Sequence, residues 1–355
     1  MAIKVLGLSL YGPLAASTRY RLSQYVPGLQ QDGIDLEVIP LLGDEYVRKI
    51  GSGKKYPLAN LAGDYGSRAA RLFSQKKYDV AIVNAEIFPL LPGFIESQLL
   101  RIPYIYDFDD AFFLKYKMER FQRVSFFLKN KFKPVVSRAA AVLAGNHYLA
   151  NYARPLNPYT YWLPTVVDTE RYMPKPCKRQ GVFTVGWIGS PSTSVYLSEL
   201  VEPLMALGRE GSVRFLVIGG HCAAIDGVEV VNLLWSEATE VEMINTFDVG
   251  VMPLFDDAWA NGKCAFKLIQ YMACGVPVVA SAVGANKDVV NDDCGLLAMT
   301  PQAWLNALRC LRDDPALRNR FGDAARSRVQ KMYSLQSTLP VMAETIKAVV
   351  AREKG

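Results

Sequence analysis

Short apolar runs alternate with helical segments from one end of the chain to the other. Because these runs are continuous and rich in Val, Ile and Leu, they suit strands that are buried on both faces of a parallel sheet. Such alternation indicates βαβ units and predicts a doubly wound α/β fold. The strand candidates are Ile3–Leu10, Leu36–Leu42, Asp79–Asn84, Tyr104–Phe108, Ala141–Gly145, Phe183–Ile188, Arg214–Ile218, Val228–Leu233, Val249–Leu254 and Val278–Ala280.

The alternation is interrupted once, between Asn157 and Arg179, where four prolines and several basic residues show little periodicity. We interpret this stretch as a linker, since 355 residues suit two domains of about 150 residues each. The prediction is two doubly wound, Rossmann-like domains, residues 1–163 and 164–335, facing each other across a cleft. A C-terminal helix at 336–355 is expected to pack back onto the first. Function is sought in the loops after strands, because ligands bind there in open α/β sheets.

Composition excludes several classes of protein. No apolar run reaches the roughly 18 residues of a membrane span, and the N-terminus lacks the features of a signal peptide. The six cysteines, at 177, 222, 264, 274, 294 and 310, show no CxxC pairing, which favours reduced thiols in a cytoplasmic protein. Only two histidines are present, so a histidine-rich metal centre is disfavoured, and a net charge of +6 permits a phosphate-bearing ligand without requiring one.

The most informative segment runs from Asn261 to Ser281. Its pattern predicts a loop, a helix at about 265–273, a C-cap at Gly275 and then a strand. Lys263, Lys267 and Gln270 share one helix face. Lysines at the start of a helix oppose its dipole at a cost of roughly 0.3–1 kcal/mol each, and a bound diphosphate would offset that cost. Two solvated lysines on an exposed turn are the alternative.

Four segments, in order, resemble motifs of glycosyltransferase family four. Lys267–Val279 is similar to its donor-site signature, K-L-x-E-Y-M-A-x-G-x-P-V-V. Leu163–Pro174 resembles the motif that this family has between its two domains. Phe247–Leu254 resembles its A-D-V-x-V-x-P-S motif, and Asp313–Arg326 resembles its D-P…A-R motif. The resemblance implies a GT-B fold, a donor-binding second domain and an acceptor-binding first domain. It also implies transfer from a nucleotide-sugar with retention.

This sequence departs from that family at two positions that usually hold glutamates eight residues apart. Here they are Gly262 and Gln270. The second glutamate usually holds the donor ribose, and Gln270 can accept one hydrogen bond there without charge assistance. The loop Gly186–Ser194 also lacks the family's usual Arg and Lys. Lys263 and Lys267 must then supply the positive charge.

The loop after the first strand of the second domain has a second predicted role. Gly189, with Ser190 and the residues that follow to Ser194, is expected to cradle phosphate oxygens through backbone and hydroxyl groups. A tight turn after a strand is the ordinary interpretation of Gly189. Trp235 and Glu237 follow another strand, and the resemblance places that loop beside the donor base. A core Trp and a solvated Glu are the alternatives.

Three carboxylates, those of Asp107, Asp109 and Asp110, end a strand of the first domain. Alternation puts Asp107 and Asp109 on one face, and Asp110 could cap the next helix. We predict a catalytic base at Asp109 and acceptor contacts at the other two. Their D-x-D spacing also resembles the metal site of the single-domain GT-A transferases, and a cap with a salt-bridged loop is a third interpretation.

Two further helix starts carry predictions. Gly12 follows the first strand, Ser17 or Thr18 is a candidate N-cap, and Arg19 and Arg21 are candidate anion contacts for the acceptor or a donor phosphate. Ordinary surface arginines are the alternative. In the second domain, the expected capping box is Thr239 with Glu242.

The run Lys115–Arg138 carries eight cations, one acid (Glu119) and four phenylalanines. A basic, aromatic helix is typical of contact with an anionic membrane surface. Nucleic acid is the competing partner, but no recognition motif accompanies the charge. A solvated helix whose phenylalanines face its own domain core is the third option.

Together these features predict a glycosyltransferase that uses a UDP- or GDP-sugar, with Lys267 stabilising the leaving diphosphate. No metal or other cofactor is expected. The expected acceptor is a glycan or lipid-linked glycan in cell-surface polysaccharide synthesis. We expect a cytoplasmic protein, peripheral on the inner face of the membrane. A sugar-nucleotide epimerase of the same fold and a catalytically degenerate binding subunit are the alternatives.

Overall fold

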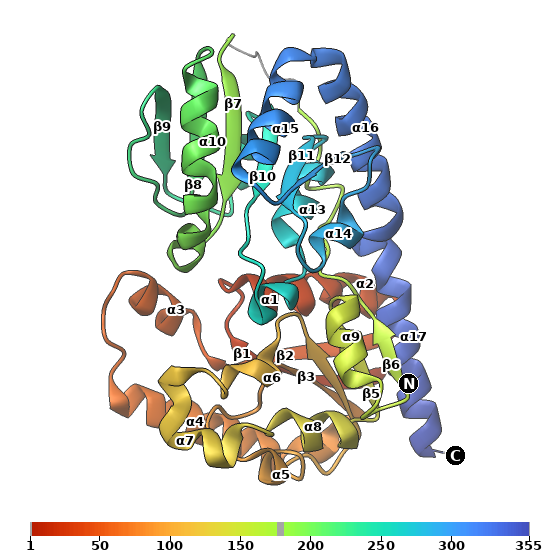
Figure 1. The fold of residues 1–355 in the computed structure, drawn as a ribbon. Helices are drawn as coiled ribbons and strands as arrows, with labels where there is room; N and C mark the ends of the chain where they lie inside the picture. Colours follow the sequence, from red (N-terminus) through yellow and green to blue (C-terminus); the bar gives the residue numbers. More distant parts are fainter. Residues whose placement is uncertain (1, 176–180, 355) are drawn as a thin grey trace. The chain divides into compact units, whose positions relative to one another are not determined.

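The computed structural model describes residues 2–175 and 181–354, which form two compact units (Figure 1). Unit 1 contains the chain up to Thr165 and again from Thr338, and unit 2 runs from Val166 to Ser337. The expected boundaries after residues 163 and 335 each lie two residues from these. From Thr338 on, the C-terminal helix therefore belongs to unit 1 although it follows unit 2 in the chain.

Unit 1 is built on a six-stranded sheet in the order β2-β1-β3-β4-β5-β6, with every pairing parallel. Its inner strands are buried throughout because helices cover both faces. The predicted linker was wrong at its start, since a short strand occurs there between two prolines and completes the sheet. The strands are β1 Ile3–Tyr11, β2 Ile34–Leu42, β3 Val80–Asn84, β4 Tyr104–Phe108, β5 Ala141–Ala144 and β6 Thr160–Trp162.

The helices of unit 1 vary from single turns to α17, which ends the described chain. Tyr25 and Thr338 share a hydrogen bond of 2.9 Å between their hydroxyls, and Arg352 donates to the Ala140 carbonyl at 3.0 Å. These bonds hold α17 against unit 1. The helices are α1 Ala16–Arg21, α2 Val26–Gln31, α3 Asp44–Gly51, α4 Leu58–Phe73, α5 Gly93–Glu96, α6 Phe112–Lys115, α7 Gln122–Leu128, α8 Phe132–Arg138, α9 His147–Ala153 and α17 Leu335–Lys354.

Unit 2 repeats the plan with the strand order β12-β11-β10-β7-β8-β9, again with every pairing parallel. The predicted doubly wound α/β class is therefore confirmed for both units. One strand, β12, was not predicted because it is four residues long and begins with glycine. The strands are β7 Phe183–Ile188, β8 Val213–Ile218, β9 Val228–Leu233, β10 Val249–Met252, β11 Val278–Ser281 and β12 Gly295–Ala298.

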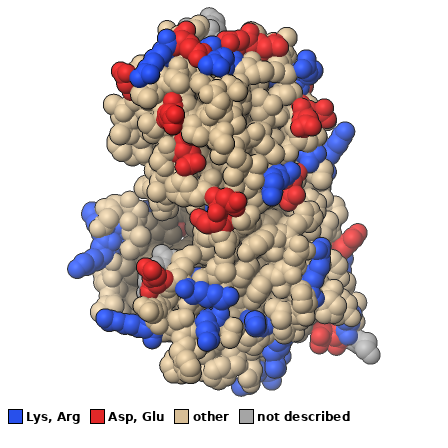
Figure 2. Space-filling view, in the orientation of Figure 1, with Lys and Arg blue, Asp and Glu red and all other residues tan. Residues whose placement is uncertain are grey.

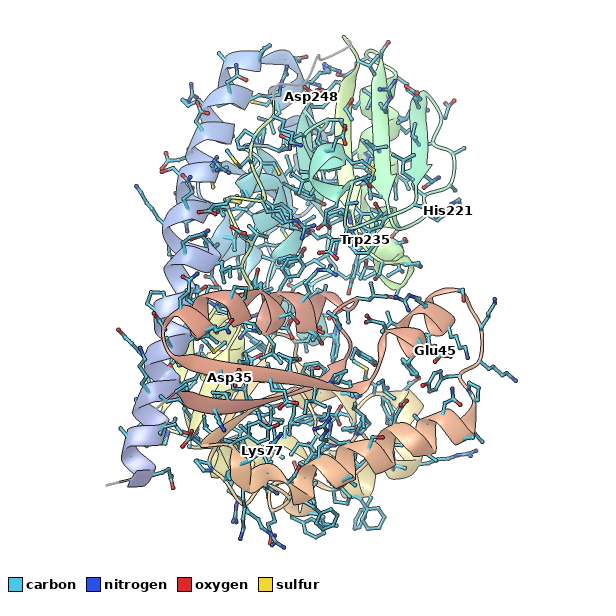
Figure 3. The ribbon with its side chains drawn as sticks, turned by 180° about the vertical axis from the view of Figure 1, so that it is seen from behind. Asp35, Glu45, Lys77, His221, Trp235 and Asp248 are labelled. Carbon is cyan, nitrogen blue, oxygen red and sulfur yellow. The ribbon has the colours of Figure 1, made fainter. Side chains whose placement is uncertain are left out.

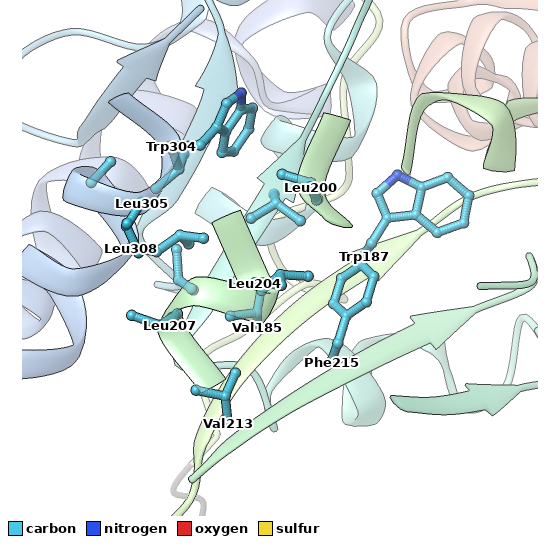
Figure 4. Packing of buried hydrophobic residues seen from close by; sticks show 14 of the residues in the cluster. Val185, Trp187, Leu200, Leu204, Leu207, Val213, Phe215, Trp304, Leu305 and Leu308 are labelled. Carbon is cyan, nitrogen blue, oxygen red and sulfur yellow. The ribbon is translucent and has the colours of Figure 1, made fainter. Parts of the chain in front are cut away.

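The core of unit 2 lies between the sheet and two helices, α10 and α15 (Figure 4). Trp187 and Phe215 project from the sheet toward Leu204 and Leu308, all at most 1% exposed. Burying each such side chain contributes roughly 1.5–3 kcal/mol. The helical segments are η4 Pro191–Leu197, α10 Ser198–Gly208, α11 Glu240–Ile244, α12 Ala258–Asn261, α13 Phe266–Ala273, α14 Asn286–Val289, α15 Pro301–Asp313 and α16 Pro315–Met332.

Candidate functional site

The carboxyl ends of β7, β8 and β9 bring Gly189, Gly219 and Trp235 together. The Gly189 amide donates to the Ile218 carbonyl at 2.9 Å. A Cβ on Gly189 would overlap the Trp187 ring, and one on Gly219 would overlap the Gly189 carbonyl and lie 2.9 Å from the Trp235 Cβ. Close approach therefore requires glycine at both positions, and this edge of the sheet exposes backbone.

Figure 3 shows which edge this is. Trp235 and His221 lie at the same end of unit 2, whereas Asp248 lies at the opposite end. Asp248 precedes β10, so its end is the amino-terminal one. Trp235, which was predicted to bind the donor, therefore lies at the carboxyl edge, where open α/β sheets bind ligands.

The start of α13 carries backbone strain. Ala265, its N-cap, has φ of +53° and is fully buried. A left-handed conformation at a residue other than glycine costs on the order of 1–3 kcal/mol and tends to occur at functional sites. Among the described residues no side chain caps α13. The positive end of the helix dipole thus faces a site where an anion would be stabilised.

Both predicted lysines lie over aromatic rings at this edge. The Lys267 Nζ is 5.4 Å from the centre of the Trp187 ring, and the Lys263 Nζ is 5.9 Å from that of Tyr196. Cation–π contacts of about 0.5–1 kcal/mol offset part of the dipole penalty. Because the Trp187 ring also contacts Gly189, the lysines, the helix start and the glycine loop form one cationic site.

The hydroxyls after Gly189 organise their own loop. Thr193 Oγ1 donates to the Ser190 carbonyl at 2.9 Å, and the Ser190 and Ser192 hydroxyls are 2.9 Å apart. Ser194 Oγ accepts from the His221 amide at 3.0 Å. These bonds fix the loop conformation. The predicted contact between Ser190–Ser194 and phosphate oxygens stays a prediction.

The loop after β9 is tied together by a glutamate that sequence reasoning missed. Glu240, 1% exposed, accepts a hydrogen bond from Trp235 Nε1 at 2.8 Å. Glu237 is exposed and pairs with Arg171 at 2.9 Å. The predicted capping box of Thr239 and Glu242 is wrong, because the side chain of Thr239 does not cap α11. Its hydroxyl pairs instead with that of Ser236 at 2.6 Å.

In unit 1, Arg21 and Asp107 form an ion pair with both side chains fully buried. Asn84 donates to the Asp107 Oδ2 at 2.8 Å, and Arg21 donates to the Leu163 carbonyl at 2.6 Å. Burial by itself lowers the pKa of Arg21, but the Asp107 carboxylate outweighs it and raises that pKa. Direct acceptor contacts at Arg21 and Asp107 were therefore wrongly expected. The pair braces the ends of the strands.

Asp109 lies just after β4 and is only partly exposed. Burial, followed by repulsion from the Asp110 carboxylate, raises the pKa of Asp109 to about 7. A carboxyl with that pKa can take or release a proton near neutral pH. Asp110 does not cap the next helix as predicted, because α6 has Ala111 at its N-cap and no side-chain cap bond.

Gly12 and Arg19 shape the loop after β1. A Cβ on Gly12 would overlap the Asp44 carboxylate, which accepts from the Leu14 amide at 3.0 Å. Arg19 Nη1 donates to the Pro13 carbonyl at 3.1 Å. Both residues therefore define the backbone of this loop, and whether they also contact an acceptor stays a prediction.

The predicted N-cap of α1 was wrong. The helix begins after Ala15, whose side chain makes no cap bond. Ser17 and Thr18 lie inside the helix, and the Thr18 hydroxyl donates to the Tyr11 carbonyl at 2.7 Å. A tertiary bond to the end of β1 thus replaces the local capping bond.

An aromatic cluster that the sequence did not reveal lies beside this loop. The rings of Tyr11 and Tyr46 stack at 5.9 Å, Tyr46 meets Tyr56 edge-on at 5.0 Å, and Tyr65 lies 5.4 Å from Phe88. All five are partly exposed, and most pack on the leucines that end β1 and β2. We call these residues the tyrosine cluster.

The basic run Lys115–Arg138 divides into buried and exposed parts. Lys131 is fully buried and pairs with Glu86 at 2.7 Å and with Glu96 at 2.8 Å, and Lys115 also pairs with Glu86. These two lysines are therefore structural, which corrects their part in the membrane prediction. Phe132 is also buried, as the core alternative expected.

The exposed part of that run is on α7 and beyond it. Phe126 and Phe127 are 78% and 69% exposed, and Arg123, Lys129 and Lys133 are exposed as well. On the face shown in Figure 2, basic side chains gather over the region of unit 1 that carries α7 and α8. No helix in the described part of the chain is long and apolar enough to cross a membrane.

Of the six cysteines, Cys177 lies outside the described residues. The other five are free thiols, four of them buried. Burial raises the pKa of Cys274 to about 12, so this thiol stays protonated. The cysteines therefore act here as small apolar side chains.

Comparison with known proteins identifies a related family for part of the chain. Residues 180–314 match the family model described as Glycosyl transferases group 1. The matched residues all lie in unit 2. The matched group 1 segment contains the glycine loop, Trp235 and both lysines. The predicted resemblance to a glycosyltransferase family is confirmed over these residues.

Curated relatives match over a shorter stretch. A D-inositol 3-phosphate glycosyltransferase of Kineococcus radiotolerans is 42% identical over 27% of this chain and 25% of its own length. One from Pseudarthrobacter chlorophenolicus is 36% identical over 30% of this chain and 25% of its own length. The match thus spans a quarter of these relatives.

Solved structures match along almost the whole chain. Sucrose-phosphate synthase from Thermosynechococcus elongatus gives a TM-score of 0.69 at 16% identity, covering 99% of this chain and 100% of that one. Anabaena Alr3699/HepE in complex with UDP-glucose gives 0.68 at 17% identity, covering 98% and 100%. This chain therefore has the predicted GT-B fold, which excludes the GT-A alternative, and the epimerase alternative is not favoured.

Proposed function

We propose that this protein transfers a sugar from a nucleotide diphosphate sugar, a UDP- or GDP-sugar, to a glycan acceptor with retention. The observation that carries the proposal is the cationic site at the start of α13, where Lys263 and Lys267 lie over aromatic rings. A diphosphate matches its charge and its uncapped helix start. The likeness to a structure that holds UDP-glucose supports this class of donor.

Each donor-site residue has a part in this proposal. Lys267 stabilises the charge that develops on the leaving diphosphate, aided by Lys263. Gly189 and Ser190 let the phosphates approach the backbone. Trp235 lies beside the base. Because two lysines and a helix dipole neutralise the diphosphate, transfer needs no divalent metal.

Glu237 and Gln270 complete the proposed donor site. Glu237 is exposed at the end of β9, where its ion pair with Arg171 limits its motion. Gln270 lies on α13, three residues after Lys267, and is 4% exposed. Its amide is the proposed partner of the donor ribose.

On unit 1, Asp109 is the proposed proton acceptor for the reacting hydroxyl. A pKa of about 7 leaves a substantial fraction ionised at neutral pH. Asp110 lies next to it and can bind an acceptor hydroxyl. Gly12 and Arg19 hold the neighbouring loop. Retention itself is proposed from the family resemblance.

The tyrosine cluster supports a glycan acceptor. Sugar-binding sites combine an apolar wall with a few polar groups, and tyrosines supply both a ring and a hydroxyl. Tyr56 donates to Asp64 at 2.8 Å, which places a carboxylate at the rim. We propose that sugar rings of the acceptor stack here. Synthesis of a cell-surface polysaccharide would provide such an acceptor.

A lipid-linked form of that glycan would require the enzyme at a membrane. Phe126 and Phe127 are exposed beside Arg123, Lys129 and Lys133. Acidic headgroups contribute about 1 kcal/mol per nearby cation, and exposed phenylalanines add apolar contact. We propose reversible attachment to the cytoplasmic face through α7.

Donor binding is tested by a thermal-shift screen against UDP-, GDP-, ADP- and dTDP-sugars. A ligand at 100 times its Kd stabilises the folded protein by about 2.7 kcal/mol. One nucleotide-sugar should raise the Tm, and purified protein should then transfer or hydrolyse that sugar. Binding without turnover would identify a degenerate binding subunit, and no shift with any donor would contradict the proposal.

A further inference from the structure

A chain of hydrogen bonds inside unit 2 ends at Gln270. The buried Glu240 carboxylate accepts from Arg171 Nη2 at 2.9 Å and from the Tyr172 hydroxyl at 2.6 Å, both at Oε1. Its Oε2 accepts from Trp235 Nε1 at 2.8 Å. Arginine and the indole N–H can only donate, so Glu240 acts as the acceptor throughout. It thereby joins the residues before β7 to the loop after β9.

The protons in this chain decide which way the Gln270 amide points. A tyrosine hydroxyl has one hydrogen and can donate one hydrogen bond. Tyr172 donates that bond to Glu240. Its oxygen can then only accept from Gln270, which lies 3.0 Å away. The amide must therefore direct its NH₂ group to Tyr172. Its carbonyl oxygen is therefore turned away from that hydroxyl.

We propose that Glu240 and Tyr172 are positioning residues that lock Gln270 with its carbonyl oxygen as the acceptor for a donor ribose hydroxyl. The inference rests on the proposed function, because the ribose belongs to the donor. Neither residue touches the donor in this scheme. An unlocked glutamine amide could turn by 180° and meet the ribose with either end, whereas the locked amide offers only an acceptor.

The same chain explains why a glutamine occupies the place of a glutamate. An ionised carboxylate at position 270 would face the lone pairs of the Tyr172 oxygen, because the Tyr172 hydroxyl already donates its hydrogen bond to Glu240. Two acceptors at hydrogen-bond distance repel, and a buried carboxylate without a donor is destabilising. Gln270 and Tyr172 are thus matched to each other.

The fixed orientation of the Gln270 amide is tested first without any donor, by thermal unfolding of Gln270→Glu. A glutamic acid at this position can donate to Tyr172 only when protonated, so the folded state raises its pKa. We expect the Tm deficit relative to wild type to be largest near pH 8 and to shrink toward pH 5. A deficit that does not depend on pH would overturn the assigned amide orientation.

The second arm measures binding of UDP and of 2′-deoxy- and 3′-deoxy-UDP by calorimetry, with GDP or ADP forms used if the protein selects another base. Wild type should bind one deoxy form about 3- to 12-fold more weakly, as expected for one hydrogen bond. In Tyr172→Phe this ratio should fall toward one. Tyr333→Phe, which removes another buried tyrosine hydroxyl of unit 2, should keep it.

The two arms separate the possible failures. A pH-dependent Tm deficit without binding of any nucleotide would contradict the proposed function and with it the ribose contact. Nucleotide binding with the same deoxy ratio in Tyr172→Phe as in wild type would overturn only the positioning role. In support of it, Tyr172→Phe/Gln270→Ala should bind UDP no more weakly than Gln270→Ala alone.

Discussion

Both sheets have six parallel strands, but their carboxyl edges differ in how charged side chains are held. In unit 2, Lys263 and Lys267 are held over aromatic rings at a strained helix start. In unit 1, the cations Arg21 and Lys131 are fully buried against carboxylates. The doubly wound plan therefore supplies an edge, and the loops decide whether that edge attracts an anion.

The difference in charge also gives the two edges different chemical groups. With Arg21 and Lys131 buried, the edge of unit 1 presents tyrosines and the Asp109 carboxyl, whose pKa is raised to about 7. The edge of unit 2 presents two lysines over aromatic rings and the start of α13. One edge suits a neutral, hydroxylated ligand and a proton transfer, and the other suits a leaving diphosphate.

The largest effect should come from breaking the buried pair of unit 1. Arg21→Met leaves the Asp107 charge buried without its partner, which costs about 3–5 kcal/mol of folding free energy. Urea unfolding should show this loss. Arg21→Met/Asp107→Leu removes both charges and should recover much of it. A wild-type midpoint for Arg21→Met would show that the pair is not structural.

Next comes the charge at the edge of unit 2. Lys267→Ala should lower turnover by roughly 10²-fold or more, which corresponds to a transition-state contact of about 3 kcal/mol. Lys287 on α14 is exposed in the same unit, so Lys287→Ala is the matched control and should leave turnover unchanged. Equal kinetics for the two variants would remove Lys267 from the site.

Asp109 should make unit 1 sensitive to pH. Its folded pKa is raised to about 7, so the stabilisation from this carboxyl is present at low pH and is lost as pH rises toward 7. Asp109→Asn should therefore raise the Tm more at pH 8 than at pH 4. Turnover of wild type should rise with pH, with a midpoint near 7. If Asp109→Asn turns over like wild type, this carboxyl is not the base.

The smallest effect concerns attachment to membranes. Phe126→Ser/Phe127→Ser should weaken co-sedimentation with anionic vesicles several-fold, because exposed apolar side chains add to the attraction between charges. Phe73 is 90% exposed on α4, and Phe73→Ser is the matched control. Binding should weaken as salt screens the surface. Wild-type protein that stays in the supernatant at low salt would favour a soluble acceptor.

Local patterns predicted the fold and the central motif well. Continuous apolar runs located ten of the twelve strands in residues 2–175 and 181–354. Gly275, with φ of +68°, ends α13 close to where it was predicted, one residue after the C-cap Cys274. Both features depend on residues close in sequence. β6 and β12 were missed because three or four residues beside prolines or a glycine carry too weak a pattern.

Contacts between residues that are distant in sequence could not be predicted from local patterns. Arg21 and Asp107 are 86 residues apart, and Lys131 and Glu86 are 45 apart. Such pairs leave no local signal, so buried cations were expected at the surface. Ala265 carries no sequence sign of its positive φ. The capping predictions at Thr18 and Thr239 were wrong because both hydroxyls bond elsewhere. The Thr18 hydroxyl bonds to the Tyr11 carbonyl, and the Thr239 hydroxyl bonds to that of Ser236.

The central claim is that the edge of unit 2 binds a nucleotide through the charge of its diphosphate. Calorimetry with UDP and uridine, in EDTA, tests it most directly on wild type and on Lys263→Met/Lys267→Met. Wild type should bind UDP far more tightly than uridine without any metal, and the double variant should lose that difference. A double variant that keeps the UDP preference, or a wild type that binds UDP only after Mn²⁺ or Mg²⁺ is added, would contradict the account.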